Sequence, residues 1–220
     1  MNQSEKMAIF RDQVTIYPVS CEKLANGRSD LEWLTEVLAG GARIVQLRDK
    51  EASDGALLAK ALKFRELTSA AGALFIVNNR LDIALLAKAD GLHLGNDDIP
   101  VQEARRLAPE LIIGVSANTE EQAATAEERG ASYYNIGPLF ATETKAGLRQ
   151  FIGPEAIARY SCHSQLPFTV MGGIKRQHIA ELTALGARRL AVVTAISQAA
   201  DIRAETRVWD KEIRQGLSKG

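Results

Sequence analysis

The chain has 220 residues, 46% of them hydrophobic and 25% charged, and its 27 basic residues balance 27 acidic ones. A formal net charge of zero argues against a nucleic-acid or membrane-surface protein that binds through excess positive charge. No apolar run approaches the roughly 20 residues that span a bilayer, and the polar first residues are unlike a signal peptide. We therefore expect a soluble, cytoplasmic protein that binds neither nucleic acid nor membranes.

Short β-rich runs alternate with longer helical patterns from one end of the chain to the other. The expected strands cover residues 14–19, 43–47, 74–77, 91–94, 111–115, 132–136, 168–171 and 189–193. The expected helices cover residues 30–39, 54–71, 81–88, 100–107, 119–129, a segment opening at 153–155, 175–185 and 197–215. Residues 1–13 are expected to be an N-terminal extension and residues 216–220 a disordered tail.

Eight strand–helix units in succession predict a parallel sheet. Eight units in 220 residues are economical for a closed (β/α)8 TIM barrel, whose usual length is about 250 residues. No linker or low-complexity stretch divides the chain, so we expect one α/β domain, residues 1–220. The alternative is an open doubly wound sheet, which the absence of a Gly-x-Gly-x-x-Gly turn after the first strand disfavours.

Polar residues fall where the expected strands end, and in a barrel of this type function collects on the loops at the C-terminal face. In the segment 46–50, Gln46 and Arg48 share a strand face with Ile44, while Val45 and Leu47 share the other. An apolar face that becomes polar and cationic predicts the floor and rim of an anion pocket. Later loops add Asn78, Asn79, Asn96, Asp97, Asp98, Ser116, Asn118, Thr142, Thr144, Lys145, Gly172, Gly173 and Thr194 to Ser197.

These residues sort into two kinds of anion site. The first offers bare backbone N–H groups and the start of a helix, which suit a phosphate monoester. It comprises Gly172, Gly173, Thr194, Ala195 and Ile196. The second, with Arg48, Lys50 and Lys145, is rich in cations and suits a diphosphate.

A carboxylate beside the cations would add a hard oxygen ligand for Mg²⁺, which takes one or two carboxylates together with phosphate oxygens and waters. Asp98 is the candidate; alternatively, Asp97 and Asp98 cap the helix that follows them. His93 lies inside an expected strand, where a packed core histidine is the more common role. No nucleophile–base pair is evident in the sequence, and loss of a stabilised diphosphate needs none.

From about Val14 to Ser197 the chain resembles the thiamine-phosphate synthase (thiamine-phosphate pyrophosphorylase) family. The motifs that carry the resemblance are the segments 46–50 (QLRDK), 78–84 (NNRLDIA), 90–95 (DGLHLG), 114–116 (GVS), 137–145 (GPLFATETK), 172–174 (GGI) and 194–197 (TAIS). The resemblance implies a (β/α)8 barrel and a transferase that joins hydroxymethylpyrimidine diphosphate to hydroxyethylthiazole phosphate. The products are thiamine phosphate and diphosphate, formed by Mg²⁺-assisted, dissociative loss of diphosphate.

The resemblance also implies roles for individual residues. Contacts to the pyrimidine diphosphate fall on Gln46, Arg48, Lys50, Asn78, Ser116 and Lys145, of which Arg48, Lys50, Ser116 and Lys145 are catalytic. Contacts to the thiazole phosphate fall on Thr142, Thr144, Gly173, Thr194, Ala195 and Ile196. The Mg²⁺ ligands are Asn79 and Asp98.

The chain departs from the family's pattern at a few of these positions. Asn79 stands where Asp is usual, so one charge is lost and the affinity for Mg²⁺ should fall. Asn96 replaces a frequent Gln, Asn118 a frequent His, and Thr194 a common Ser. None of these changes removes the cationic cluster.

Two alternatives to the synthase stay open. One is a related thiazole tautomerase-like isomerase, against which the cationic cluster counts because an isomerase holds no diphosphate. The other is a non-catalytic regulator that binds a phosphorylated ligand, suggested by Asn79. The sequence does not determine the oligomeric state, and a homo-oligomer is one of the alternatives that stay open.

Overall fold

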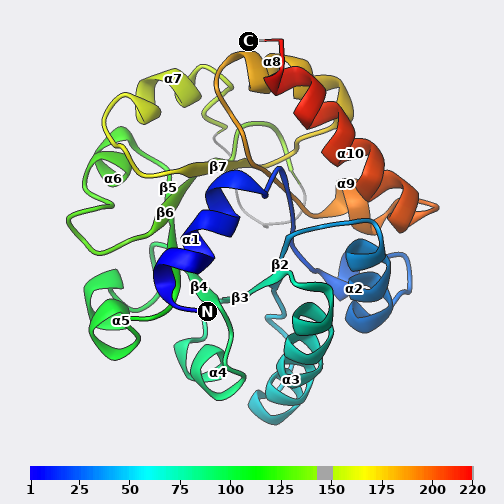
Figure 1. The fold of residues 1–220 in the computed structure, drawn as a ribbon. Helices are drawn as coiled ribbons and strands as arrows, with labels where there is room; N and C mark the ends of the chain where they lie inside the picture. The colour runs from blue at the N-terminus through cyan, green and yellow to red at the C-terminus, as the bar shows by residue number, and fades with distance from the viewer. Residues whose placement is uncertain (143–150, 220) are drawn as a thin grey trace.

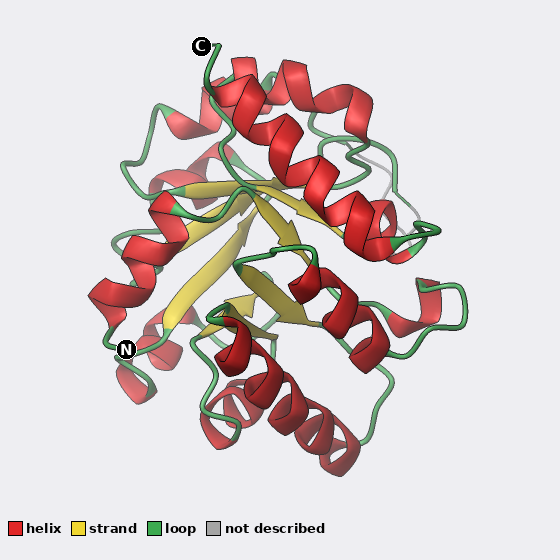
Figure 2. Cartoon of the chain, turned by 45° about the vertical axis from the view of Figure 1, so that its right-hand side comes forward, coloured by secondary structure: helices red, strands yellow, loops and turns green. Residues whose placement is uncertain are grey.

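The computed structural model describes residues 1–142 and 151–219, and it shows eight parallel strands around a common axis, surrounded by helices (Figures 1 and 2). The strands are β1 Ile16–Pro18, β2 Ile44–Leu47, β3 Leu74–Asn78, β4 Gly91–Leu94, β5 Ile112–Ala117, β6 Tyr133–Ile136, β7 Phe168–Met171 and β8 Leu190–Val192. Each lies within three residues of its expected position at both ends.

The sheet closes on itself. Its strand order is β1-β8-β7-β6-β5-β4-β3-β2, and its two outer strands meet in a parallel bridge between Val19 and Gln46. Beside this bridge, the backbone N–H of Ser20 donates to the carbonyl oxygen of Gln46 at 2.9 Å. The expected (β/α)8 barrel is therefore confirmed, and the open sheet is excluded.

The helices follow the strands as expected, with differences at some ends. They are α2 Asp30–Ala39, α3 Asp54–Ala71, α4 Leu81–Leu86, α5 Val101–Leu107, α6 Glu120–Ala124, α7 Ala156–Ser161, α8 Ile179–Ala184, α9 Thr194–Ser197 and α10 Ile202–Leu217. Both α2 and α3 start where predicted because Ser29 and Ser53 cap them, accepting hydrogen bonds from the N–H groups of Glu32 and Ala56. Thr119 caps α6 by accepting a hydrogen bond from the Gln122 N–H, but that helix ends at Ala124 rather than at 129.

Residues 3–12 form a helix, whereas the sequence predicted only an N-terminal extension at residues 1–13. This helix, α1 (Gln3–Asp12), lies across one end of the barrel in Figure 1. Its Phe10 is fully buried, with the ring centroid 4.6 Å from that of Tyr133 inside the barrel. The guanidinium of Arg189 holds the end of α1, because its Nε donates to the carbonyl oxygen of Phe10 at 2.7 Å. Helix α1 therefore plugs the N-terminal mouth.

The other terminus is also ordered further than expected. Helix α10 continues to Leu217, two residues into the segment for which a disordered tail was predicted. Within residues 1–142 and 151–219, none of the helices combines the length and apolar character that crossing a bilayer requires.

Side chains of the strands alternate between two apolar cores. The outward set, such as Val45 and Leu47, packs beneath the helices. The inward set includes Ile44 and Ile76 and fills the barrel with Phe10 of α1. Towards the C-terminal ends of the strands the inward positions become polar, which places a polar floor beneath the loops that follow.

Candidate active site

A cavity of about 370 Å³ opens at the C-terminal ends of the strands. Side chains and backbone from many of the strand-end loops contribute to its wall. Of the residues predicted for the site, the wall includes Gln46, Arg48, Lys50, Asn78, Asn79, Ser116, Thr142, Gly173, Thr194 and Ala195. The structure thus brings members of both predicted anion-binding sets into a single cavity. Thr144 and Lys145, also predicted, lie outside the described residues.

One wall of the cavity is cationic. Arg48 is half-buried and Lys50 exposed, and in the described part of the chain neither forms an ion pair with a carboxylate. The backbone N–H of Arg48 donates to the Ser20 hydroxyl at 3.1 Å, which ties the end of β2 to the end of β1. Two cations without carboxylate partners, facing a cavity, suit an anionic ligand.

Asp49 turns away from this wall and fixes the loop that carries it. Its Oδ1 accepts hydrogen bonds from the N–H groups of Glu51 and Ala52, both at 3.0 Å, and its Oδ2 accepts one from Lys60 Nζ at 2.7 Å. Burial would raise the pKa of Asp49, but these hydrogen bonds hold it below its ordinary value. The carboxylate between the two cations therefore supports the loop rather than neutralising the wall.

Lys60 of α3 is the centre of this support. Its ammonium contacts Glu22 at 2.8 Å and both Asp30 and Asp49 at 2.7 Å. Burial alone would lower the pKa of Lys60, yet its hydrogen bonds to these three carboxylates raise it above its ordinary value. This role was not predicted from the sequence, because the three acids are 11 to 38 positions from Lys60.

A hydrogen-bonded chain of side chains crosses the floor of the cavity. Gln46 Nε2 donates to the Tyr17 hydroxyl at 2.9 Å, which lies 3.0 Å from the Tyr133 hydroxyl. The Tyr133 hydroxyl lies 3.2 Å from His93 Nδ1, and His93 Nε2 lies 3.3 Å from Ser116 Oγ. We call these five residues the floor chain. Only Gln46 and Ser116 were predicted for the site.

The inner members of the floor chain are uncharged near neutral pH. Burial lowers the pKa of His93 to about 4, and it raises the pKa of both Tyr17 and Tyr133 above the ordinary value. Gly114 makes room for the chain, because a Cβ at that position would overlap the Tyr133 ring. His93 is thus buried, as expected for a packed core histidine, but it also lines the cavity.

The glycine-rich wall is shaped by close backbone approach. Gly172 and Gly173 have φ of 102° and 62°, in the left-handed region that favours glycine. A Cβ on Gly173 would overlap the carbonyl oxygen of Ala141, so glycine lets the loop after β6 lie against the loop after β7. Thr194 and Ala195 line the cavity beside them. Ile196 is buried away from the wall, and its N–H donates to the Val193 carbonyl oxygen at 3.2 Å.

Of the two predicted Mg²⁺ ligands, only Asn79 lines the cavity. Asn79 lines the cavity at φ 64°, whereas Asp98 does not line it and accepts a hydrogen bond from the Gly95 N–H at 2.6 Å. Asp97 reaches the wall instead. The helix-capping alternative is not observed, because Pro100 occupies the N-cap of α5 without a side-chain hydrogen bond.

Within residues 1–142 and 151–219, no group of three His, Cys, Asp or Glu side chains is placed to hold a metal ion. An amide oxygen with one or two carboxylates is nevertheless a donor set that suits Mg²⁺, which takes few protein ligands and keeps phosphate oxygens and waters. The residues present therefore fit a Mg²⁺ ion that would complete its coordination with phosphate oxygens and waters.

Two of the departures noted in the sequence contact each other at the rim. Asn96 Nδ2 donates to Asn118 Oδ1 at 2.6 Å, and Asn118 Nδ2 donates to the carbonyl oxygen of Gly137. Tyr160 of α7 adds a hydrogen bond from its hydroxyl to the Asn118 carbonyl oxygen at 2.9 Å. These bonds link the loops after β4, β5 and β6 by uncharged groups.

Comparison with known proteins agrees with this arrangement. A family model described as thiamine monophosphate synthase matches residues 16–196. The chain belongs to the thiamine monophosphate synthase family. Thiamine-phosphate synthase from Moorella thermoacetica is 43% identical over 196 residues, which is 89% of this chain and 93% of the relative. Thiamine-phosphate synthase from Methanospirillum hungatei is also 43% identical, over 193 residues, which is 87% of this chain and 94% of the relative.

A solved structure supports the same family at the level of the fold. Thiamine phosphate pyrophosphorylase from Pyrococcus furiosus superposes with a TM-score of 0.85 at 32% identity, covering 96% of this chain and 98% of its own. The resemblance inferred from the motifs is therefore confirmed, and the chain is an enzyme of the thiamine monophosphate synthase family.

Proposed function

We propose that the protein condenses hydroxymethylpyrimidine diphosphate with hydroxyethylthiazole phosphate to give thiamine phosphate and diphosphate. The observation that carries the proposal is the presence of two anion-binding walls in one cavity. Arg48 and Lys50 form a cationic wall without carboxylate partners in the described chain, and Gly173 and Thr194 belong to an uncharged one. One cavity therefore suits two phosphorylated substrates of different charge.

The reaction breaks the bond between the pyrimidine methylene carbon and a diphosphate oxygen, which leaves with the electron pair. The pyrimidine amino group donates electron density to the methylene carbon, and the thiazole ring nitrogen then attacks it to form the new carbon–nitrogen bond. Arg48 and Lys50 hold the diphosphate and stabilise the charge that develops on it. Gln46 orients the pyrimidine ring, and Gly173 and Thr194 place the thiazole phosphate so that its nitrogen faces the carbon.

Asn79 and the carboxylates at 97–98 would hold Mg²⁺, which when bound neutralises charge on the diphosphate oxygens. We assign Lys145 and Thr144 the roles that the family resemblance implies, a contact to the pyrimidine diphosphate for Lys145 and a contact to the thiazole phosphate for Thr144. Ser116 completes the pyrimidine diphosphate contacts.

The proposal is tested by supplying both phosphorylated heterocycles with Mg²⁺ and following thiamine phosphate and diphosphate. We expect equal amounts of both products. Tautomerisation of a thiazole carboxylate phosphate without coupling would support the isomerase instead. Binding of the thiazole phosphate without turnover at any Mg²⁺ concentration would support the regulator, the alternative that the uncharged Asn79 favours.

A further inference from the structure

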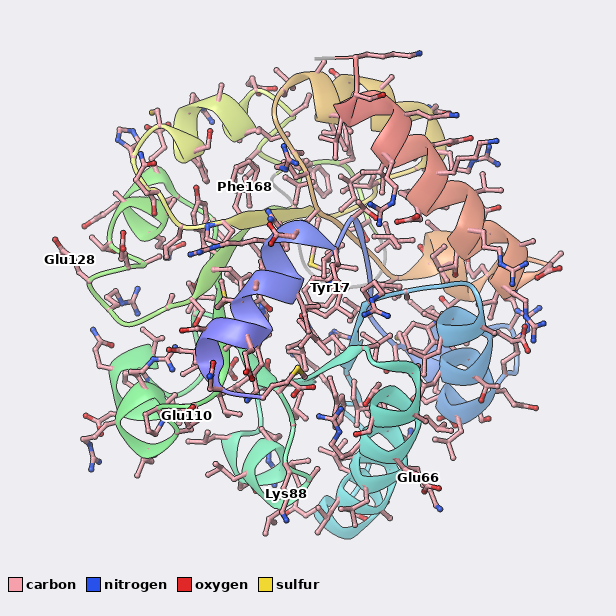
Figure 3. The ribbon with its side chains drawn as sticks, in the orientation of Figure 1. Tyr17, Glu66, Lys88, Glu110, Glu128 and Phe168 are labelled. Carbon is pink, nitrogen blue, oxygen red and sulfur yellow. The ribbon has the colours of Figure 1, made fainter. Side chains whose placement is uncertain are left out.

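With Gln46 oriented so that its Nε2 donates to the Tyr17 hydroxyl, the floor chain has one consistent arrangement of its hydrogens. Tyr17, near the centre of the barrel in Figure 3, is 1% exposed and accepts the N–H of Gln46 through its hydroxyl oxygen. A phenol has a single hydrogen to donate. Among the described residues, the acceptor within reach of that hydrogen is the Tyr133 oxygen, at 3.0 Å.

The remaining hydrogens follow in sequence. Tyr133 accepts from Tyr17, so its own hydrogen goes to His93 Nδ1 at 3.2 Å. A neutral imidazole carries one hydrogen, so accepting at Nδ1 places that hydrogen on Nε2. His93 Nε2 then donates to Ser116 Oγ at 3.3 Å. The Ser116 hydrogen is left to turn into the cavity.

The reverse order fails at Tyr17. If Ser116 donated to His93 Nε2, then Nδ1 would donate to Tyr133 and Tyr133 to Tyr17. The Tyr17 hydrogen would then face the Gln46 amide nitrogen, itself a donor, and a buried donor without an acceptor is costly. The reverse order therefore requires the Gln46 amide to be turned, with its oxygen on Tyr17. The orientation of Gln46 and the role of Ser116 are coupled through the chain.

We propose that the floor chain fixes the hydrogen-bonding polarity of the cavity, with Gln46 presenting its oxygen as an acceptor and Ser116 its O–H as a donor. Tyr17, Tyr133 and His93 are positioning residues in this account. The arrangement selects a ligand that places an N–H donor against Gln46 and an acceptor against Ser116. Given the proposed function, the donor is the exocyclic amino group of the pyrimidine, and the acceptor is an oxygen or ring nitrogen of the same substrate.

The tautomer of His93 tests the chain without any catalytic measurement. In protein labelled with ¹⁵N-histidine, two-bond ¹H–¹⁵N correlation spectra distinguish Nε2–H from Nδ1–H imidazoles, and a His93→Gln variant identifies the signal. The expected result is Nε2–H in the ligand-free protein near neutral pH. A predominant Nδ1–H tautomer would overturn the proposal, whatever reaction the enzyme catalyses.

A pair of neighbouring tyrosines supplies a matched test. Tyr133→Phe removes the hydroxyl that donates to His93, whereas Tyr134→Phe removes a buried hydroxyl that has no hydrogen-bond partner in the described chain. Tyr133→Phe also takes away the acceptor of the Tyr17 hydrogen, so the Gln46 amide should turn to offer its oxygen to Tyr17, and KM for the pyrimidine diphosphate should rise about tenfold. KM for the thiazole phosphate should stay near the wild-type value, and Tyr134→Phe should change neither.

A thermal melt shows whether each variant is folded. If Tyr133→Phe does not fold, Tyr17→Phe removes the acceptor of the Gln46 N–H and is expected to give the same KM split, while Tyr133 still donates to His93 and keeps it Nε2–H. An equal rise in both KM values, or unchanged KM values in the folded variants, would contradict the positioning role. If neither substrate is turned over by the wild type, the proposed function fails while the tautomer result still decides this inference.

Discussion

Asp49 and Lys60 form an ion pair of 2.7 Å directly behind the cationic wall of the cavity. Asp49 stands between Arg48 and Lys50 in the sequence, so this contact joins the segment that faces the ligand to α3. Because Lys60 also contacts Asp30, whose side chain is 1% exposed, the pair belongs to a largely buried cluster.

Lys60→Met should therefore weaken both the fold and the site. The substitution leaves Asp30 buried without its cation and removes the anchor of Asp49, and we expect a loss of about 2–3 kcal/mol in the free energy of unfolding. KM for the pyrimidine diphosphate should rise because the loop carrying Arg48 and Lys50 is less well held. Chemical denaturation and steady-state kinetics measure the two effects.

Lys63→Met is the control on the same helix. The side chains of Lys63 and Glu66, which form an ion pair, are 63% and 66% exposed. Loss of this pair should therefore lower the free energy of unfolding by less than about 1 kcal/mol. If the Lys60 and Lys63 variants lose the same stability, the buried cluster does not have the role assigned to it.

The free energy of unfolding should fall as the pH is lowered through a window set by the pKa of His93. Its pKa is about 4 in the folded protein against an ordinary 6.5, so between these values the unfolded chain binds a proton that the folded protein does not. Lowering the pH through this window should therefore cost about 3 kcal/mol of stability. Denaturation at a series of pH values in wild type and His93→Gln measures the difference.

The exposed His163 supplies the comparison, since His163→Gln leaves the buried ring in place. Between pH 6.5 and 4, we expect the free energy of unfolding to depend less steeply on pH in the His93 variant. The slope should be unchanged in the His163 variant. Equal slopes in the wild type and the His93→Gln protein would exclude His93 as the source.

Asn79→Asp should lower the Mg²⁺ concentration needed for half-maximal rate. The substitution adds a carboxylate to the cavity wall without changing the side chain's size, and Asp tolerates the left-handed conformation found at φ 64°. A Mg²⁺ titration of the initial rate measures the change. An unaltered half-maximal concentration would mean that residue 79 does not bind the metal.

Gly173→Ala should distort the uncharged wall. The alanine Cβ would overlap the Ala141 carbonyl oxygen, and the φ of 62° at this position adds backbone strain. We therefore expect the free energy of unfolding to fall by about 1–3 kcal/mol and the thiazole phosphate to bind more weakly. Gly186→Ala is the matched control, because φ there is 89° but a Cβ would meet nothing within 4 Å. Weakened binding in both variants would point to a general effect rather than to the wall.

The periodic alternation of strands and helices was enough to predict the barrel. Capping serines at positions 29 and 53 are local signals, and they place the starts of α2 and α3 correctly. Helix α1 was not predicted because its buried residues are few and its hold on the barrel comes from distant partners such as Arg189.

For the site, Gln46, Asn78 and Ser116 lie at or near the C-terminal ends of their strands and line the cavity, while their contacts to a substrate stay predictions. Residues that act through others were missed, since Tyr17 and Tyr133 become neighbours only when the barrel closes. Asp98 and Ile196 were predicted both from the residue types of the strand-end loops and from the family resemblance. In the structure Asp98 instead accepts a hydrogen bond from the Gly95 N–H, and Ile196 is buried.

The most direct test follows an equimolar mixture of the two substrates with Mg²⁺ by ³¹P NMR. The account predicts that both substrate signals give way to thiamine phosphate and diphosphate in equal amounts. Arg48→Met should slow this conversion at least tenfold, whereas Arg106→Met, which removes a surface ion pair with Glu103, should leave it unchanged. Unaltered substrate signals in the wild type, or equal rates in the two variants, would contradict the central claim.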